Sequence, residues 1–259
     1  MTDKRPVHFH LLPDLVPPGR LRGATAVAID VLRGTTTMTT ALAAGCTDIR
    51  PCGTVEEARE LAAGLGDGRA LLGGERHNVK IKGFDLGNSP LEYTTAVCQG
   101  KTLVMTTSNG TRALLRAVEA ERVLAASFVN FSAVCEQLRH DPRPIHLVCA
   151  GTDGAVTLED TLLAGALVDY LSQKFDAGLN DSARLAWDGF KQRGSCLLAA
   201  LEMSDGARGL LALGHGPDIE FASQVDRFHL VPELRRDPLR LEKAAFEIVQ
   251  NPGGCRGSP

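Results

Sequence analysis

Acidic, basic and hydroxyl side chains stand close together in "AIDVLRGTTTMTTAL", residues 28–42. Asp30 ends an apolar run, Arg33 follows three residues later, and Thr35 and Thr36 begin a row of hydroxyls. Carboxylates with hydroxyls and water suit Mg²⁺, whereas an arginine and the free N–H groups of a helix start suit phosphate. This stretch therefore has the side chains to bind a divalent cation and a phosphate.

Three other polar stretches occupy the same position, each at the end of an expected strand. They are residues 75–78, 106–112 and 151–160, and they add carboxylates, hydroxyls and further arginines, Arg112 among them. In open α/β sheets, ligands bind outside the carboxyl ends of the strands. We therefore expect all four stretches to lie at the same edge of one sheet.

Each stretch also has an ordinary structural interpretation, which the sequence leaves open. Ser, Thr, Asp and Asn commonly cap helices, so "TTSNGTR" could be only a helix start and Asp30 only a cap. Glu75 could lie in a solvated loop, and the acids of "LEDTLLAG" could simply favour the first turn of a helix. The expected convergence of the four stretches favours a site.

The elements that position these stretches are strands alternating with helices. Small apolar residues predict a strand over 24–30, and a helix follows over 35–45. The order of strand, polar stretch and helix recurs in 101–118, 122–138 and 144–171. Thr54 with Glu57 three residues later predicts a capped helix over 54–66. This pattern predicts an α/β fold of three layers, α/β/α, with a largely parallel sheet.

Length and pattern favour one domain over residues 1–248, and any division into two lobes is expected near 140–145. After residue 181 the pattern turns helical, with a late strand in "FHLVPEL". The tail, residues 249–259, is expected to be flexible.

Composition excludes several classes of protein. The chain has 28 basic and 31 acidic residues, a net charge of −3, and no dense basic run, which argues against nucleic-acid binding. No apolar segment reaches the ~18 residues needed to span a bilayer, and we expect neither a membrane partner nor a signal peptide. The 7 cysteines are scattered without paired spacing, which favours reduced thiols in a cytoplasm over disulfides or zinc.

Several well-known catalytic motifs are missing. The sequence contains no P-loop, no G-x-G-x-x-G after the first strand, no G-x-S-x-G elbow and no H-E-x-x-H. Phosphatases with an aspartyl nucleophile place a second aspartate two residues after the first, and Leu32 stands at that position. Cys149 lacks an arginine-bearing loop after it, which favours a small buried residue over a nucleophile.

Several long segments resemble the 2-phosphosulfolactate phosphatase family. They include "AIDVLRGTTT", "LLGGER", "GFDLGNSPLEY", "TLVMTTSNGTRAL", "LAASFVNFSAV", "LVCAGTDGAVTLEDTLLAGALVDYL" and "DIEFASQVD", in order from residue 28 to about residue 226. The resemblance implies a Mg²⁺-dependent phosphatase that converts 2-phospho-3-sulfolactate to sulfolactate and phosphate, a step that serves coenzyme M synthesis in methanogens. The resemblance indicates the type of reaction more firmly than it indicates the substrate.

The resemblance and the residues together suggest roles at the site. Asp30, Glu75 and Asp160 are candidate Mg²⁺ ligands, with Glu159 as an alternate. Asp30 and Arg33 are the candidate catalytic residues. Candidates for binding the small anionic phosphorylated substrate are Thr35, Thr36, Asn88, Ser89, Ser108, Asn109, Gly110, Thr111 and Arg112.

Alternatives remain at this stage. Asp30 could instead be a covalent nucleophile, and Arg112 could pair with a carboxylate on a neighbouring stretch rather than with phosphate. The chain could also be a non-catalytic binding protein for a small phosphorylated acid, or a phosphotransferase. The sequence leaves the oligomeric state open, a homodimer included.

Overall fold

The structure is a computed structural model that describes residues 4–66 and 68–245. The expected flexible tail, 249–259, lies outside the described residues. Within them, one sheet holds β1 (Arg5–His10), β2 (Thr25–Ile29), β3 (Asp48–Pro51), β4 (Ala70–Arg76), β5 (Val79–Lys80), β6 (Thr102–Thr106), β7 (Arg122–Ala126), β8 (Ile145–Cys149), β9 (Ala177–Leu179), β10 (Pro232–Arg236) and β11 (Leu239–Lys243).

Helices follow most of these strands. They are α1 (Gly34–Ala43), α2 (Val55–Leu65), α3 (Thr95–Cys98), α4 (Gly110–Ala117), α5 (Phe131–His140), α6 (Leu158–Ser172), α7 (Asp181–Arg193), α8 (Leu197–Glu202), α9 (Asp205–Ala212) and α10 (Gly216–Ala222). Short 3₁₀ turns are η1 (Pro13–Leu15), η2 (Pro90–Glu92), η3 (Phe128–Asn130) and η4 (Gly194–Cys196). The predicted cap of α2 is confirmed, because the Thr54 side chain accepts a hydrogen bond from the Glu57 N–H at 3.1 Å.

The expected three layers are present, and β2 shows why. Its side chains alternate, so that Val27 and Ile29 join one apolar cluster with α5, α6 and α7. Ala26 and Ala28 join a second cluster with α1 and α4 on the opposite face. A strand buried on both faces is typical of a parallel sheet between two helical layers. The mixed α/β fold with a mostly parallel sheet is therefore confirmed.

The expectation that all four polar stretches share one sheet edge is wrong in its topology. The sheet order is β5-β4-β6-β3-β11-β10-β7-β2-β8-β1-β9. Strands β4, β6 and β3 are mutually parallel, and so are β7, β2, β8, β1 and β9. The hairpin β10–β11 joins these groups through antiparallel pairs, so the two groups run in opposite directions.

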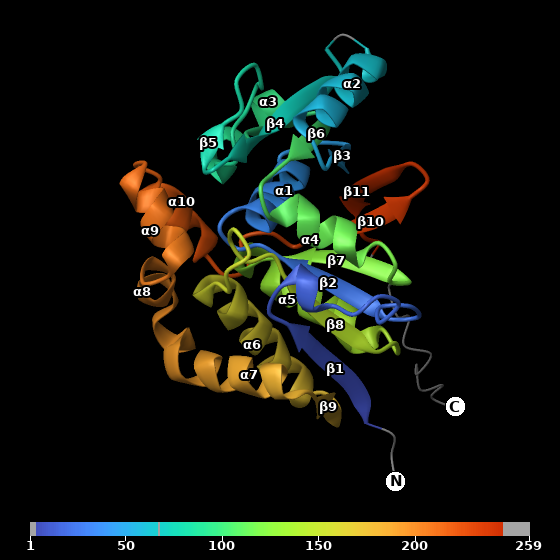
Figure 1. Ribbon diagram of the computed structural model, residues 1–259, viewed down its shortest axis with the longest axis vertical. Helices are drawn as coiled ribbons and strands as arrows, with labels where there is room; N and C mark the ends of the chain where they lie inside the picture. The colour runs from blue at the N-terminus through green and yellow to red at the C-terminus, as the bar shows by residue number, and fades with distance from the viewer. Residues whose placement is uncertain (1–3, 67, 246–259) are drawn as a thin grey trace, which may run out of the picture.

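The carboxyl ends of the two groups meet nevertheless. The hairpin pairs with β7 and with β3 through one residue pair each, Glu233 with Leu124 and Leu241 with Ile49. In Figure 1, α1 and α4 lie between the two groups, and both helices contact strands of both. The polar stretches after β2, β4, β6 and β8 therefore converge around these two helices.

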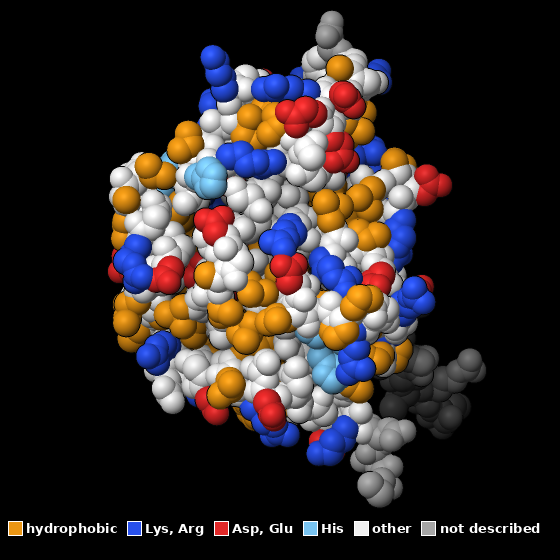
Figure 2. All heavy atoms as spheres, in the orientation of Figure 1, with side chains coloured by type: hydrophobic (Ala, Val, Ile, Leu, Met, Phe, Trp, Pro, Cys, Tyr) orange, Lys and Arg blue, Asp and Glu red, His pale blue; other side chains and the backbone are white. Residues whose placement is uncertain are grey.

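The distribution of charged side chains on the surface does not indicate a particular binding partner. On the face seen in Figure 2, Lys and Arg are interspersed with Asp and Glu, without a large patch of one sign. No helix in the described ranges is both long enough and apolar enough to cross a membrane.

Candidate active site

Asp30 lies directly after β2, between the first turns of α1 and α4. Its side chain is buried, and a methyl group added to Gly34 in α1 or to Gly110 in α4 would overlap its Oδ2. Only glycine lets two backbones approach a carboxylate this closely. The N-termini of both helices therefore face Asp30, and the positive ends of their dipoles favour an anion there.

Asp160 and Glu159 occupy the first turn of α6. Asp160 Oδ1 accepts a hydrogen bond from the Val31 N–H at 2.8 Å, and its Oδ2 accepts one from the Gly151 N–H at 3.1 Å. Glu159 lies against α9, where a methyl group on Gly206 would overlap its Oε1, and its Oε2 has no hydrogen-bond partner. Asp160 therefore links the ends of β2 and β8.

These three acids carry raised pKa values. Burial, with the charge of Asp160 adding to it, raises the pKa of Asp30 well above its usual range, although a backbone hydrogen bond from Gly34 opposes this. Burial raises the pKa of Asp160 to about 6 against its backbone hydrogen bonds. Burial and the charge of Asp160 raise the pKa of Glu159 to about 7. A cation among these carboxylates would relieve their repulsion.

The donor set fits a lightly coordinated Mg²⁺ rather than an all-protein cage. In the described part of the chain, no three His, Cys, Asp or Glu side chains are placed to hold a metal ion together. Mg²⁺ usually keeps several waters and takes one or two carboxylates. Asp30 and Asp160 match that requirement, because both are buried and no described side chain forms a salt bridge with either.

Glu75 connects the ends of β4 and β6. Its Oε1 accepts a hydrogen bond from the Ser108 N–H at 2.7 Å, and its Oε2 accepts one from the Ser108 hydroxyl at 3.1 Å. The Asn78 N–H also donates to Oε2, at 2.9 Å. These contacts assign Glu75 and Ser108 to the support of the site, while the metal role expected for Glu75 stays a prediction.

Arg33 is buried and held by a residue far away in the sequence. Its Nη1 donates to Oδ2 of Asp218 in α10 at 2.6 Å. The Ser89 hydroxyl donates to the other oxygen, Oδ1, also at 2.6 Å. Asn88 precedes Ser89, and its buried Oδ1 has no hydrogen-bond partner. The "LGNSP" turn therefore reaches the site through Ser89.

The threonine hydroxyls are used by the backbone. Thr35 Oγ1 lies 2.7 Å from carbonyl oxygens at the ends of β2 and β7, and Thr36 Oγ1 donates to the Val31 carbonyl at 2.8 Å. Thr111 Oγ1 donates to the Thr107 carbonyl at 3.0 Å. The hydroxyls of Thr35, Thr36 and Thr111 therefore bind backbone carbonyls of the loops, and the substrate-binding role expected for these three residues stays a prediction.

Asn109 joins the β6 stretch to the β8 stretch, because its Oδ1 accepts a hydrogen bond from the Asp153 N–H at 3.2 Å. Arg112 points to the surface and forms an ion pair with Asp14 in η1, with its side chain 52% exposed. This pair resembles the structural alternative, although Asp14 lies in η1 rather than on one of the four polar stretches.

Cys149, at the end of β8, is buried, and burial raises the pKa of its thiol well above the usual range, with the nearby acids adding to the shift. A thiol in this setting is a poor nucleophile.

Comparison with known proteins agrees with the resemblance seen in the sequence. The model of the family described as 2-phosphosulpholactate phosphatase matches residues 10–237. The chain belongs to this family. Proteins named "Probable 2-phosphosulfolactate phosphatase" from Thermotoga petrophila and Caldanaerobacter subterraneus are 43% and 38% identical to it. These alignments cover 85% of this chain in both cases, and 93% and 91% of the two relatives.

Within this member of the phosphatase family, sequence reasoning missed Asp218. It lies in "DIEFASQVD", but no pattern near it suggests a site, since an acid in the first turn of a short helix is ordinary. Only the fold brings α10 to Arg33. Arg76 was also missed, at the end of β4, where its Nη2 donates to the Thr106 hydroxyl at 2.9 Å.

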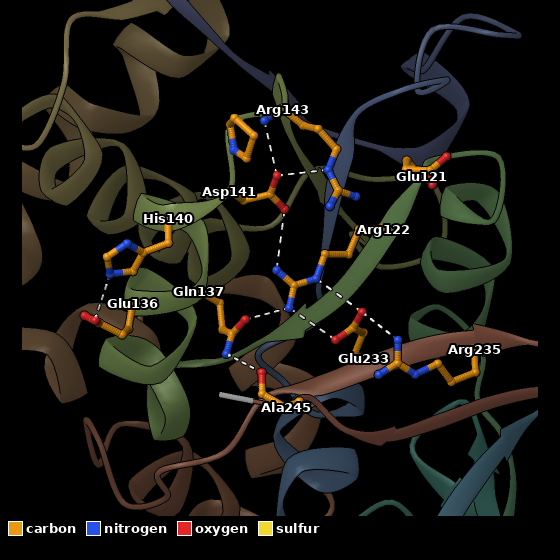
Figure 3. Close-up of a pocket in the computed structure, with 11 residues that line it drawn as sticks. Glu121, Arg122, Glu136, Gln137, His140, Asp141, Arg143, Glu233, Arg235 and Ala245 are labelled. Atoms are coloured by element: carbon orange, nitrogen blue, oxygen red, sulfur yellow. Dashed lines mark hydrogen bonds and ion pairs between the residues drawn. The ribbon is translucent and has the colours of Figure 1, made fainter. Parts of the chain in front are cut away.

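A large pocket of the protein lies elsewhere. It has a volume of about 470 Å³ and is lined by Arg122, Asp141, Arg143, Glu233, Arg235 and other polar residues. Figure 3 shows these side chains pointing toward one another in a network of ion pairs. None of the predicted site residues lines it, and Arg122 begins β7, at the opposite end from the polar stretches.

Proposed function

We propose that this chain is a Mg²⁺-dependent phosphatase that hydrolyses the phosphate monoester of 2-phospho-3-sulfolactate, or of a related 2-hydroxy acid. Family membership supports the class of reaction. One observation supports the location of the site. The buried Asp30 carboxylate lies between two helix N-termini, and it is so close to Gly34 and Gly110 that a side chain at either position would overlap it. The phosphate of the substrate would bind beside this carboxylate, at the positive N-terminal ends of α1 and α4.

Asp30 and Asp160 would hold the Mg²⁺. When bound, Mg²⁺ supplies charge neutralisation at the phosphate and orients the attacking water. Water attacks phosphorus, the bond from phosphorus to the ester oxygen breaks, and the hydroxy acid leaves with a proton on that oxygen. The N–H groups at the two helix starts are fixed in advance and stabilise the charge that develops on the phosphoryl oxygens.

Arg33 would bind an oxyanion of the substrate beside this centre. Glu75 and Ser108 keep the β4 and β6 stretches in place, and Asn109 does the same between the β6 and β8 stretches. Six free cysteines among the described residues support a reducing cytoplasm as the location. A role in coenzyme M synthesis would follow only where the host has the rest of that pathway.

The test is a phosphate-release screen of 2-hydroxy-acid phosphates with and without Mg²⁺, in the absence of any nucleotide. We expect release from 2-phospho-3-sulfolactate that EDTA abolishes and Mg²⁺ restores. Full activity after exhaustive chelation would contradict the metal. Tight binding without release would favour a binding protein, and transfer that needs an acceptor would favour a phosphotransferase. Trapping of a phosphoryl group on Asp30 would favour the covalent route.

A further inference from the structure

The Nη1 group of the Arg33 guanidinium is paired, whereas the edge formed by Nε and Nη2 lacks a strong hydrogen-bond partner. Its Nη1 forms an ion pair with Asp218 in which each side chain is 2% exposed. Its buried Nε has no hydrogen-bond partner, and its Nη2 has only a long contact, 3.4 Å, with the Asn78 carbonyl. Nε and Nη2 lie on one edge of the planar group, and such an edge binds two oxygens of one anion.

Asp218 is itself fixed on both of its oxygens. The Ser89 hydroxyl donates to Oδ1 at 2.6 Å, while Oδ2 accepts from Arg33. His215, in the turn before α10, lies near the same carboxylate, with its Nδ1 3.6 Å from Oδ2. The carboxylate therefore cannot rotate freely, and it sets the direction in which the open edge of Arg33 points.

The open edge requires a ligand other than the phosphate held at Asp30. A buried charged donor without a partner costs free energy, so a partner is expected there. No salt bridge joins Arg33 to Asp30 in the described chain, although only two residues separate them. The long contact of Nη2 places the edge beside Asn78, in the turn between β4 and β5.

We propose that Asp218 is a positioning residue, which turns the Nε–Nη2 edge of Arg33 toward a second anionic group of the substrate, a carboxylate or a sulfonate. The proposal rests on the proposed function, because it takes the phosphate to lie at Asp30. It explains why a residue of α10 belongs to the site without touching the reacting atoms. It also assigns substrate selectivity to the Asp218–Arg33–Ser89 network.

The test compares Asp218→Asn with the parent protein on three phosphate esters. These are p-nitrophenyl phosphate, which lacks a second anion, 2-phospholactate, which has a carboxylate, and the phosphate ester of 2-hydroxyethanesulfonate, which has a sulfonate. We expect KM to rise about 10-fold or more for at least one of the last two, with kcat changed less than about 3-fold. Both constants should stay within about 3-fold for p-nitrophenyl phosphate.

The pattern of losses identifies the group. A larger rise in KM for 2-phospholactate assigns the edge to the carboxylate, and a larger rise for the sulfonate ester assigns it to the sulfonate. An equal fall in kcat/KM for all three esters would mean that Arg33 binds the transferring phosphate, and would overturn the proposal. Unchanged constants for all three would overturn it as well.

Asp141→Asn is the matched control. Asp141 is also a buried carboxylate paired with arginines, but it lies at the far end of the strands. Its replacement should leave the KM ratio between the esters unchanged. If Asp218→Asn does not fold, Ser89→Ala removes one hydrogen bond from the same carboxylate. It should raise KM about 3-fold more for the two esters that carry a second anionic group than for p-nitrophenyl phosphate, and an unchanged KM ratio would overturn the proposal.

A separate binding measurement distinguishes this proposal from the proposed function. If the parent protein releases phosphate neither from these esters nor from 2-phospho-3-sulfolactate, the proposed function fails. Calorimetric titration with sulfolactate or lactate still tests the positioning role. We expect Asp218→Asn to weaken the binding of at least one of them about 10-fold. Equal affinities in the parent and the variant would contradict a role for Asp218 in either case.

Discussion

Two clusters of buried charge lie at opposite ends of the parallel strands β7, β2 and β8, and they differ in how their charges are balanced. At the amino ends, Asp141 has a hydrogen bond from Thr25 at 2.6 Å and ion pairs with Arg122 and Arg143. Burial opposes ionisation there, but these partners hold the pKa of Asp141 below its usual range. At the carboxyl ends, Asp30 and Asp160 have no salt bridge in the described chain, and their pKa values are raised.

The difference distinguishes a cluster whose charges are neutralised within the protein from one whose charges are left for the ligand that we propose. Charges that are already neutralised, as in the pocket of Figure 3, hold the protein together but have little left to offer a ligand. Charges left unbalanced at a strand end lower stability and persist where function needs them.

The largest expected effect is the loss of turnover in Asp30→Asn. Removing this charge should lower kcat about 10³-fold, because the amide binds a cation poorly and disturbs the centre between the two helix starts. Phosphate release measures the loss, and circular dichroism checks the fold. Asp141→Asn should keep kcat within about 2-fold. Similar losses in both variants would remove the distinction between the two clusters.

The stability of the same two variants should change in opposite directions. Asp141→Asn removes the buried charge that pairs with Arg122 and Arg143, which costs about 2 kcal/mol and lowers Tm by about 4–8 °C in a domain of this size. In EDTA at pH 8, Asp30→Asn should instead raise Tm, because it removes an unpaired buried charge. Differential scanning calorimetry measures both. A fall in Tm for Asp30→Asn as large as that for Asp141→Asn would contradict this assignment.

In metal-free protein, the raised pKa values of the acids at the strand ends should make the fold less stable as pH rises. Asp160, with a pKa of about 6, and Glu159, with a pKa of about 7, hold protons in the folded chain that the unfolded chain has lost. Their contribution to the free energy of unfolding therefore falls as pH rises through 6–7.

Two histidines change the stability with pH in the opposite direction. The prediction therefore compares the parent protein with Asp160→Asn. Burial lowers the pKa of His10 to about 4 and that of His146 to about 3, which makes the fold less stable as pH falls below about 6.5. These residues are common to the parent and Asp160→Asn. The Tm of Asp160→Asn minus the Tm of the parent should therefore increase between pH 5 and 8. A difference in Tm that stays constant would show that Asp160 does not titrate in this range.

The smallest expected effect is that of Arg112→Ala. An exposed ion pair contributes about 1 kcal/mol or less, so Tm should change by less than about 4 °C and kcat/KM by less than about 3-fold. Steady-state kinetics on 2-phospho-3-sulfolactate measures the second value. A fall of about 10²-fold would instead show that Arg112 leaves Asp14 and binds the phosphate during turnover.

Local patterns in the sequence were sufficient for much of the fold. The apolar run before Asp30 and the cap at Thr54 depend on neighbouring residues, so both appear in the sequence and in the structure. The hairpin β10–β11 could not be placed in the middle of the sheet, because its long-range pairs, such as Leu241 with Ile49, leave no local pattern. The opposite directions of the two strand groups follow from that insertion and were missed for the same reason.

The same distinction between local patterns and long-range contacts applies to the candidate site. The polar stretches could be found because each follows a recognisable strand, and the contact of Gly110 with Asp30 brings two of them together. The hydroxyls of Thr35 and Thr36 could not be assigned, since sequence does not show whether a hydroxyl faces a ligand or a backbone carbonyl. Asp218 is joined to Arg33 by the tertiary fold alone.

The most direct test of the account is a Mg²⁺ titration of three proteins, with Tm as the readout. The account predicts that Mg²⁺ raises the Tm of the parent and of Asp141→Asn by the same amount, because a ligand stabilises the fold that binds it. It predicts no such rise for Asp30→Asn. A rise in Asp30→Asn equal to that of the parent would show that the cation binds elsewhere, and would contradict the claim that the unbalanced acids at the strand ends form the site.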